Sequence, residues 1–143
     1  MKKLLAVLSS LVLLSLGSGC AVNRATATVE NPAALTNLKT MHVIKLEADG
    51  RGIDGLIADK LRTRGLTVTT GAEKPATVDA LVTYKDKWMW DITMYMLELT
   101  ITIREPKTDF PLGTGNSFHT SLTRKSPTEM VDEVIENIFK QGK

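Results

Sequence analysis

The sequence contains one cysteine, only two histidines and few aromatic residues, which make up 5% of its 143 positions. One cysteine cannot form a disulfide within the chain, and two histidines alone cannot complete a zinc site of three or four ligands. The charges are nearly balanced, with 18 basic and 16 acidic residues, so the composition gives no basic surface of the kind that binds nucleic acid. We therefore expect no metal, no cofactor and no nucleic-acid partner.

The chain begins with a pattern typical of a secretory signal peptide. Two lysines follow Met1, and an almost wholly apolar run extends from Leu4 to Leu16. This run has the length of a signal-peptide core, about 7–15 residues, and is shorter than the ~20 residues of a membrane-spanning helix. Small residues then lead to Cys20. We predict that residues 1–19 are a signal peptide that is removed.

The surroundings of Cys20 resemble the lipobox of bacterial lipoproteins. Ser18 and Gly19 are the small residues that precede the cysteine in that motif, whereas Gly17 stands where an aliphatic residue is usual. The resemblance implies cleavage before Cys20, a covalent lipid with palmitate-type acyl chains on this residue, and attachment to the periplasmic face of the outer membrane. The alternative is cleavage at the Ala-x-Ala site of residues 25–27, which would release a soluble periplasmic protein.

The remaining chain divides into a tether and one domain. Residues 20–38 are rich in alanine, threonine and asparagine, and we predict that they form the lipidated N-terminus and a flexible tether, with 32–38 available to pack on the domain. Residues 39–143 are numerous enough to form a single α+β domain with one core.

Hydrophobic periodicity predicts five strands and two helices in this domain. The predicted strands span 41–46, 66–70, 80–90, 94–104 and 116–122, and the predicted helices span 53–64 and 127 to near the C-terminus. Ser126, Pro127 and Glu129 form a capping box with proline in the first turn, which marks the start of the last helix.

The order β-α-β-β-β-β-α predicts an α+β fold. We expect a two-layer sandwich, in which a mixed and mostly antiparallel sheet carries both helices on one face. The first two strands are predicted to be parallel, and the third and fourth to form a long hairpin with a bulge near 85–87. Alternate apolar residues from Tyr95 to Ile103 predict the buried face of this hairpin, with Met94 and Met96 on the opposite side.

Three segments of the domain resemble a group of small, uncharacterised proteobacterial lipoproteins. They are Tyr84–Tyr95 (YKDKWMWDITMY), Arg104–Thr108 and Arg124–Pro127. The order of elements is also similar to that of LptE, a lipopolysaccharide-transport subunit, and of TolB N-terminal-like domains. The resemblance implies a location in the cell envelope and a helix-on-sheet fold, and it brings no activity with it.

One candidate site stands out in a chain poor in aromatic residues. Trp88, Trp90, Met94 and Met96 gather near one end of the predicted hairpin. Because tryptophan and methionine are enriched at interfaces, we predict that these residues bind an envelope protein partner or a lipid. The alternative is that they fill the core beneath the helices.

The other polar residues lack the spacing of a catalytic site. The serines lack a Gly-x-Ser-x-Gly setting, the histidines lack metal-ligand spacing, and the Gly50–Gly52 segment lacks most of a phosphate loop. These polar residues are Asp86, Asp91, Glu98, His42, His119, Ser117, Ser121, Arg124 and Lys125. We therefore predict no catalytic residue and expect a non-enzymatic accessory or scaffold subunit of an envelope assembly. The alternatives are an LptE-like lipopolysaccharide-transport module and an envelope hydrolase.

Overall fold

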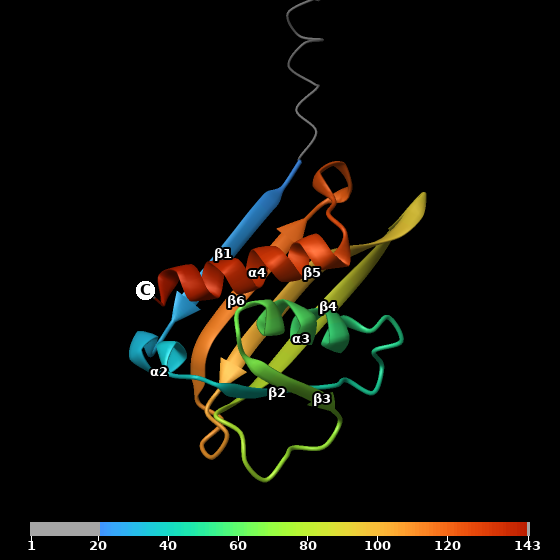
Figure 1. Ribbon diagram of the computed structural model, residues 1–143. Helices are drawn as coiled ribbons and strands as arrows, with labels where there is room; N and C mark the ends of the chain where they lie inside the picture. Colours follow the sequence, from blue (N-terminus) through green and yellow to red (C-terminus); the bar gives the residue numbers. More distant parts are fainter. Residues whose placement is uncertain (1–20, 143) are drawn as a thin grey trace, which may run out of the picture.

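A computed structural model describes residues 21–142, which form a six-stranded sheet with helices packed on one face (Figure 1). The strand order is β1-β6-β5-β4-β2-β3. β2 is parallel to β3 and β4, and the other neighbours are antiparallel. The strands are β1 (Asn23–Val29), β2 (Thr40–Ile44), β3 (Thr67–Gly71), β4 (Ala80–Asp91), β5 (Thr93–Arg104) and β6 (Pro111–His119). The helices are α2 (Pro32–Thr36), α3 (Ile53–Thr63) and α4 (Pro127–Gln141), with a 3-10 turn η2 (Ser121–Thr123).

This architecture confirms the predicted α+β two-layer sandwich. Figure 1 shows α3 and α4 side by side on one face of the sheet, as expected from their apolar stripes. α4 begins with the predicted capping box, in which the Ser126 side chain accepts from the backbone N–H of Glu129 and the Glu129 carboxylate accepts from that of Ser126. Lys60 of α3 joins the two helices at their surface through ion pairs of 3.3 Å to Asp132 and 2.9 Å to Glu136.

The segment predicted to be a flexible tether instead contributes a strand and a short helix. β1 pairs with β6 along its whole length, from Asn23 opposite His119 to Val29 opposite Gly113. Leu35 of α2 is buried in the core, with 2% of its surface exposed. The described part of the segment therefore belongs to the folded domain. Small apolar residues that alternate with threonine have the composition of a linker. The same segment forms a strand here because it can pair with the edge of β6.

A bulge in the β4–β5 hairpin decides which side chains face the helices. Lys87 lies opposite Glu98 while Trp88 lies opposite Met96, so Leu97 is an extra residue in β5. An extra residue reverses the alternation of faces along the strand. Met96 therefore joins Leu99 in the core beneath the helices, with 1% of its surface exposed. The prediction that Met96 lies away from the helices is wrong for this reason.

β6 brings the sheet close to α4 through glycine. A Cβ atom at Gly115 would lie 2.7 Å from Cγ1 of Val134 and 2.9 Å from Cγ1 of Ile138. Only a residue without a side chain lets the helix pack at this distance.

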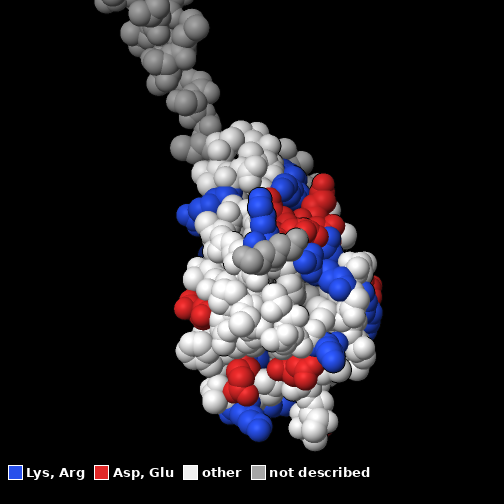
Figure 2. Space-filling model, turned by 60° about the vertical axis from the view of Figure 1, so that its left-hand side comes forward, with Lys and Arg blue, Asp and Glu red and all other residues white. Residues whose placement is uncertain are grey.

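On the side of α2 and β1, Figure 2 shows basic and acidic residues mixed around a broad uncharged area, in keeping with the balanced composition.

Candidate functional site

The end of the β4–β5 hairpin projects from the sheet (Figure 1). It carries a group of exposed apolar side chains, which we call the hairpin tip. It consists of Met89, Trp90, Ile92 and Met94, whose exposed fractions are 44%, 68%, 87% and 46%. Such side chains are usually buried, and an exposed group of them marks a surface that contacts something else. The tip contains Trp90 and Met94 of the predicted partner-binding patch.

The other two residues of that patch belong to the body of the domain. Met96 is buried in the core, so it is not available at the surface. Trp88 is half-buried against the core, and its indole Nε1 donates to the carboxylate of Asp86 at 2.6 Å. The guanidinium of Arg51 lies over its ring, 4.0 Å from the centroid. The binding role of Trp90 and Met94 stays a prediction.

Ile92 forms the turn of the hairpin in an unfavourable backbone conformation. Its φ angle is 61°, and its neighbours Asp91 and Thr93 are already paired across the two strands. A β-branched residue in this left-handed region costs roughly 1–3 kcal/mol, whereas glycine and asparagine adopt it readily. The chain thus keeps an apolar residue where both the backbone and the solvent disfavour it. Such a local conflict is expected at functional positions.

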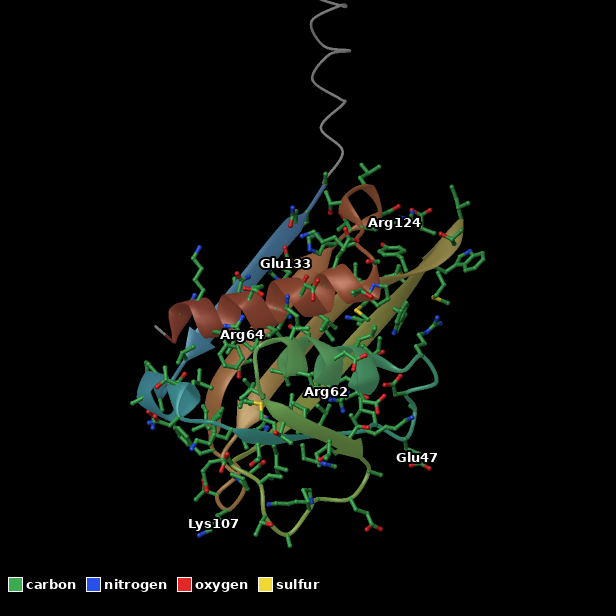
Figure 3. The ribbon with its side chains drawn as sticks, viewed as in Figure 1. Glu47, Arg62, Arg64, Lys107, Arg124 and Glu133 are labelled. Carbon is green, nitrogen blue, oxygen red and sulfur yellow. The ribbon has the colours of Figure 1, made fainter. Side chains whose placement is uncertain are left out.

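The loop that contains η2 holds the base of the hairpin tip. Ser121 donates a hydrogen bond to the carboxylate of Asp91. Arg124 donates to the hydroxyl of Thr93 at 2.8 Å, and its guanidinium lies over the ring of Tyr95, 4.8 Å from the centroid. Figure 3 shows Arg124 between η2 and the hairpin. Arg124 is therefore a supporting residue of the tip as well as an exposed cation.

The same loop holds the start of the described chain. The backbone N–H of Val22 donates to the hydroxyl of Thr120 at 3.0 Å, and its carbonyl accepts from the Thr123 hydroxyl at 2.6 Å. Val22 is 38% exposed, and Leu122 in η2 is 77% exposed. Figure 1 shows the start of β1 and the loop after β6 at the same end of the domain as the end of the β4–β5 hairpin, and the hydrogen bonds of Val22 and Ser121 to this loop and hairpin agree with it. Cys20, the predicted lipidation site, lies outside the described residues.

A buried polar cluster lies between β6 and α4. One carboxylate oxygen of Glu133 accepts from the Ser117 hydroxyl at 2.6 Å and lies 2.7 Å from Nε2 of His119. The other oxygen accepts from Nζ of Lys125 at 2.6 Å. Burial raises the pKa of Glu133, but the hydrogen bonds from His119, Lys125 and Ser117 outweigh it and lower the pKa to about 2. Sequence reasoning missed Glu133, which meets the strand residues only in the fold.

This cluster does not have the arrangement of a hydrolase relay. In such a relay the serine donates to the histidine, whereas Ser117 and His119 both face Glu133. Both side chains are 0% exposed, so neither reaches a substrate on the surface. Nδ1 of His119 is buried without a hydrogen-bond partner among the described residues.

The remaining sequence candidates are separated by the fold. Asp86 bonds Trp88, Asp91 bonds Ser121, and Glu98 accepts from the side chain of Asn116 at 2.9 Å, so the three carboxylates do not converge. His42 belongs to β2, and its Nδ1 lies 2.7 Å from the hydroxyl of Thr69 in the neighbouring β3. Within residues 21–142 no group of three or more histidines and carboxylates could hold a metal ion.

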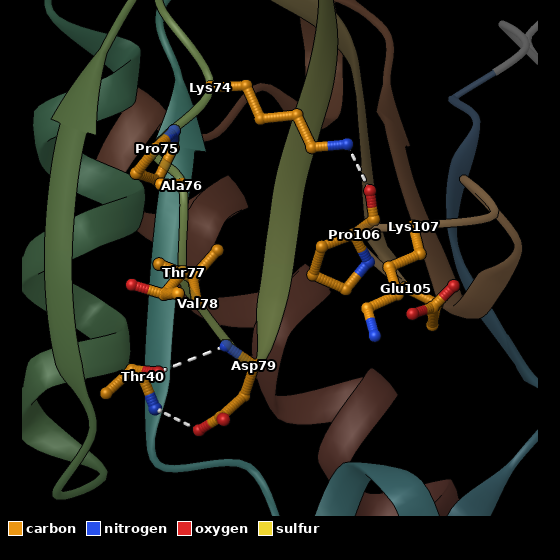
Figure 4. A pocket seen from close by; sticks show the side chains of 10 residues that line it. All are labelled: Thr40, Lys74, Pro75, Ala76, Thr77, Val78, Asp79, Glu105, Pro106 and Lys107. Carbon is orange, nitrogen blue, oxygen red and sulfur yellow. Dashed lines mark hydrogen bonds between the residues drawn. The ribbon is translucent and has the colours of Figure 1, made fainter.

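Two hollows lie away from the tip. The larger, about 780 Å³, lies between the loop before β4 and the β5–β6 turn (Figure 4). Lys74 donates to the carbonyl of Pro106 across it, and the carboxylate of Asp79 accepts from the backbone of Thr40 at 2.8 Å. The smaller, about 350 Å³, is lined by the Ala48–Arg51 loop, Asp86 and Trp88. Both are open and offer no convergent set of catalytic groups.

Asp49, beside the smaller hollow, serves the fold. Its carboxylate accepts from the Tyr84 hydroxyl at 2.7 Å and from the backbone N–H of Asp54 in the first turn of α3 at 3.1 Å. Burial raises the pKa of Asp49, but these bonds together with that from the N–H of Arg51 outweigh it and lower the pKa. Gly52, the N-cap residue, has no side chain to do this, so Asp49 caps the helix from a distance.

The chain folds as a small helix-on-sheet domain, and some solved structures have a similar fold. No family model matches the sequence, and neither does any curated protein. A PelC dodecamer from Paraburkholderia phytofirmans has a similar fold, with a TM-score of 0.61 and 14% identity over 82% of this chain and 97% of that chain. A PDZ domain protein from Parabacteroides distasonis gives a TM-score of 0.53 at 15% identity over 93% of this chain and 39% of that chain.

A lipoprotein is also among the structural neighbours. The minor lipoprotein from Acinetobacter baumannii aligns with a TM-score of 0.38 and 13% identity over 73% of this chain and 90% of that chain. This TM-score is too low to carry an argument, and the first two likenesses show a shared fold alone. Among the described residues no helix has the length and apolar character needed to cross a membrane.

Proposed function

We propose that the chain is a lipid-anchored envelope lipoprotein, attached through Cys20 to the periplasmic face of the outer membrane. It acts there as a non-enzymatic accessory or scaffold subunit of an envelope assembly. The observation that carries the proposal is the pairing of β1 with β6 from Asn23 to Val29. Cleavage before Cys20 keeps this strand whole and places the lipid directly against the folded domain.

The alternative cleavage site conflicts with the fold. Cutting after Ala27, at the Ala-x-Ala site, would remove five of the seven residues of β1 and leave the edge of β6 unpaired. An unpaired hydrogen-bonding edge favours aggregation and costs stability. The structure therefore supports cleavage before Cys20 as the route to a stable mature protein.

The distribution of polar groups supports a scaffold role. The residues that most resemble catalytic groups, Ser117, His119 and Glu133, hold β6 against α4. Ser117 and His119 are fully buried, and the Glu133 side chain is 19% exposed. The similar fold of PelC, whose structures are dodecamers, favours an assembly that contains several copies of this chain.

The exposed hairpin tip is also compatible with the alternative function, an LptE-like lipopolysaccharide-transport module. The tip has the cation of Arg124 at its base, and an apolar surface beside a cation suits lipopolysaccharide.

The anchor is tested on the full chain expressed in a diderm bacterium. Mass spectrometry of the N-terminal peptide of the membrane-extracted protein should show acylated Cys20 as the first residue. Inner and outer membranes are separated by density, and the protein should follow the outer membrane. A Cys20→Ala variant is the control and should remain uncleaved or unlipidated. A mature chain that begins at Thr28 would overturn the proposal.

The assembly is tested separately by native mass spectrometry and photo-crosslinking of the lipidated protein in membranes. A crosslinker placed at Trp90 reports on the hairpin tip, and one placed at Phe110, exposed on the β5–β6 turn, reports on the opposite end. A defined oligomer, or one envelope protein captured in stoichiometric amount, supports the scaffold role. A monomer without stoichiometric adducts at either end would overturn the scaffold role. Turnover of an envelope substrate by the protein would show that it is an enzyme and would also overturn the proposal.

A further inference from the structure

We infer that the hairpin tip, together with Val22 and Leu122, is a membrane-contacting surface that inserts into the lipid leaflet carrying Cys20. This inference rests on the proposed anchor and names what the tip contacts. The occupant is the bilayer itself, and a protein partner or a second copy of the chain is an alternative that the test below separates.

The exposed apolar side chains are concentrated at one end of the molecule. Seven large hydrophobic residues are exposed among the described residues, and six of them are in the hairpin tip, at Val22 or at Leu122. The seventh, Phe110, lies on the β5–β6 turn at the opposite end (Figure 1). A surface that merely tolerates exposed apolar residues would scatter them, so this gathering indicates one apolar contact.

The path of the chain places the membrane at this same end. Val22 is bonded to Thr120 and Thr123, and the neighbouring Ser121 is bonded to Asp91 of the hairpin. Cys20 precedes Val22 by two residues, and two residues of chain span at most about 7 Å. A lipid on Cys20 is therefore attached within about 7 Å of Val22, at the end of the domain where the η2 loop and the hairpin meet.

The chemistry of the tip suits the boundary between headgroups and acyl chains. Trp90 has an apolar ring and a polar N–H, the combination that is enriched at membrane interfaces. Both faces of the hairpin end are apolar, because Met89 points to one side and Trp90 to the other. Arg124 and Arg24, which lies over the ring of Phe118, are cations at the same end that can meet lipid phosphates.

The conformation of Ile92 fits this contact. The most exposed of these apolar residues occupies the turn in a strained backbone, where asparagine or glycine would be favourable in water. Contact with acyl chains would explain why an apolar residue is kept there. Together with the lipid on Cys20, the tip would give the domain a second attachment point and fix its orientation. The open hollow beside Lys74 and the β5–β6 turn then face away from the membrane.

The experiment uses the two tryptophans as depth probes. The lipidated chain with Trp88→Phe, which leaves Trp90 as the only tryptophan, is reconstituted in vesicles of phosphatidylethanolamine and phosphatidylglycerol. Dibrominated phosphatidylcholine should quench most of its emission, and acrylamide from the aqueous phase should quench little. The matched control, Trp90→Phe, reports on half-buried Trp88 and should be far less sensitive to the brominated lipid.

Two substitutions then separate insertion from folding. Ile92→Asn relieves the backbone strain, so the domain folds, and it should reduce the quenching of Trp90 by brominated lipid. Phe110→Ser removes an exposed apolar residue at the other end and should leave the quenching unchanged. Emission of Trp90 that brominated lipid does not affect would overturn the inference. In that case full access of acrylamide indicates a free tip, and protection from it indicates a protein contact.

The proposed lipid anchor and the proposed membrane contact of the hairpin tip can be refuted separately. The mass of the Cys20 peptide reports on the anchor, and the quenching of Trp90 reports on the tip. Because Cys20 is the only cysteine, the chain can also be coupled through its thiol to a maleimide phospholipid. The tip is then tested at the membrane whether or not cells acylate this residue.

Discussion

Nε2 of His119 and a carboxylate oxygen of Glu133 lie 2.7 Å apart and join β6 to α4. Ser117 donates to the same oxygen, and Lys125, in the loop before α4, donates to the other. One carboxylate thus connects a strand, a loop and a helix. Its charge should make the stability of this junction depend on pH.

Glu133→Gln should lower the stability of the domain at neutral pH and flatten its dependence on acid. The pKa of Glu133 is lowered from 4.5 to about 2, so the charged form stabilises the fold. This contribution, about 3 kcal/mol, is present above pH ~4.5 and is lost as the pH falls towards 2. Urea unfolding of both proteins between pH 2 and pH 7 measures it. A constant difference across this range would contradict the prediction.

Gly115→Ala should destabilise the domain by about 1–3 kcal/mol, because the added methyl group meets Val134 and Ile138 of α4. The matched control is Gly55→Ala in α3, where a Cβ atom has nothing within 4 Å. Alanine is the better helix former, so this variant should gain about 0.5–1 kcal/mol. Thermal unfolding of the two variants and the parent compares them. If the two variants changed the stability equally, α4 would not be in close contact with β6 at Gly115.

Ile92→Asn should stabilise the isolated domain in water by about 1 kcal/mol, because asparagine adopts a φ near 61° with less strain than a β-branched residue. Ile92→Val keeps the β-branch and should give no gain. Chemical denaturation in the absence of lipid is the measurement. Loss of stability in the asparagine variant would mean that the turn is not strained.

Met96→Ala should cost about 2–5 kcal/mol, as expected for a buried methionine. Met94→Ala, two residues earlier in β5, should change stability by less than about 0.5 kcal/mol because Met94 is exposed. The pair tests the bulge at Leu97, since regular alternation through this point would not place Met96 in the core. Similar losses in both variants would contradict the register observed here.

Local signals predicted the parts of the fold that depend on neighbouring residues. The start of α4 follows from Ser126, Pro127 and Glu129, which are all within one turn, and the structure confirms it. The bulge could be expected near its place, but its effect on Met96 could not. Met96 and Leu97 are both apolar, so the alternation does not show which of them faces the core until β4 fixes the pairing.

The candidate site was only partly predictable for a related reason. Trp90 and Met94 attract notice because they are uncommon residues close together in sequence. Val22 and Leu122 are ordinary residues far apart, and only the bonds between Val22 and the η2 loop bring them to the hairpin. Ile92 gave no sequence signal, because a positive φ cannot be inferred from a residue that normally avoids it.

The pairing of β1 with β6 sets the order in which the domain can be completed. β1 is the first strand to be synthesised, and its only partner among the described strands follows roughly 90 residues later. Until that partner emerges, the N-terminal strand has no edge to join and the sheet stays open. The edge of the sheet at β1 can therefore close only after β6, near the C-terminal end of the sequence, has been made.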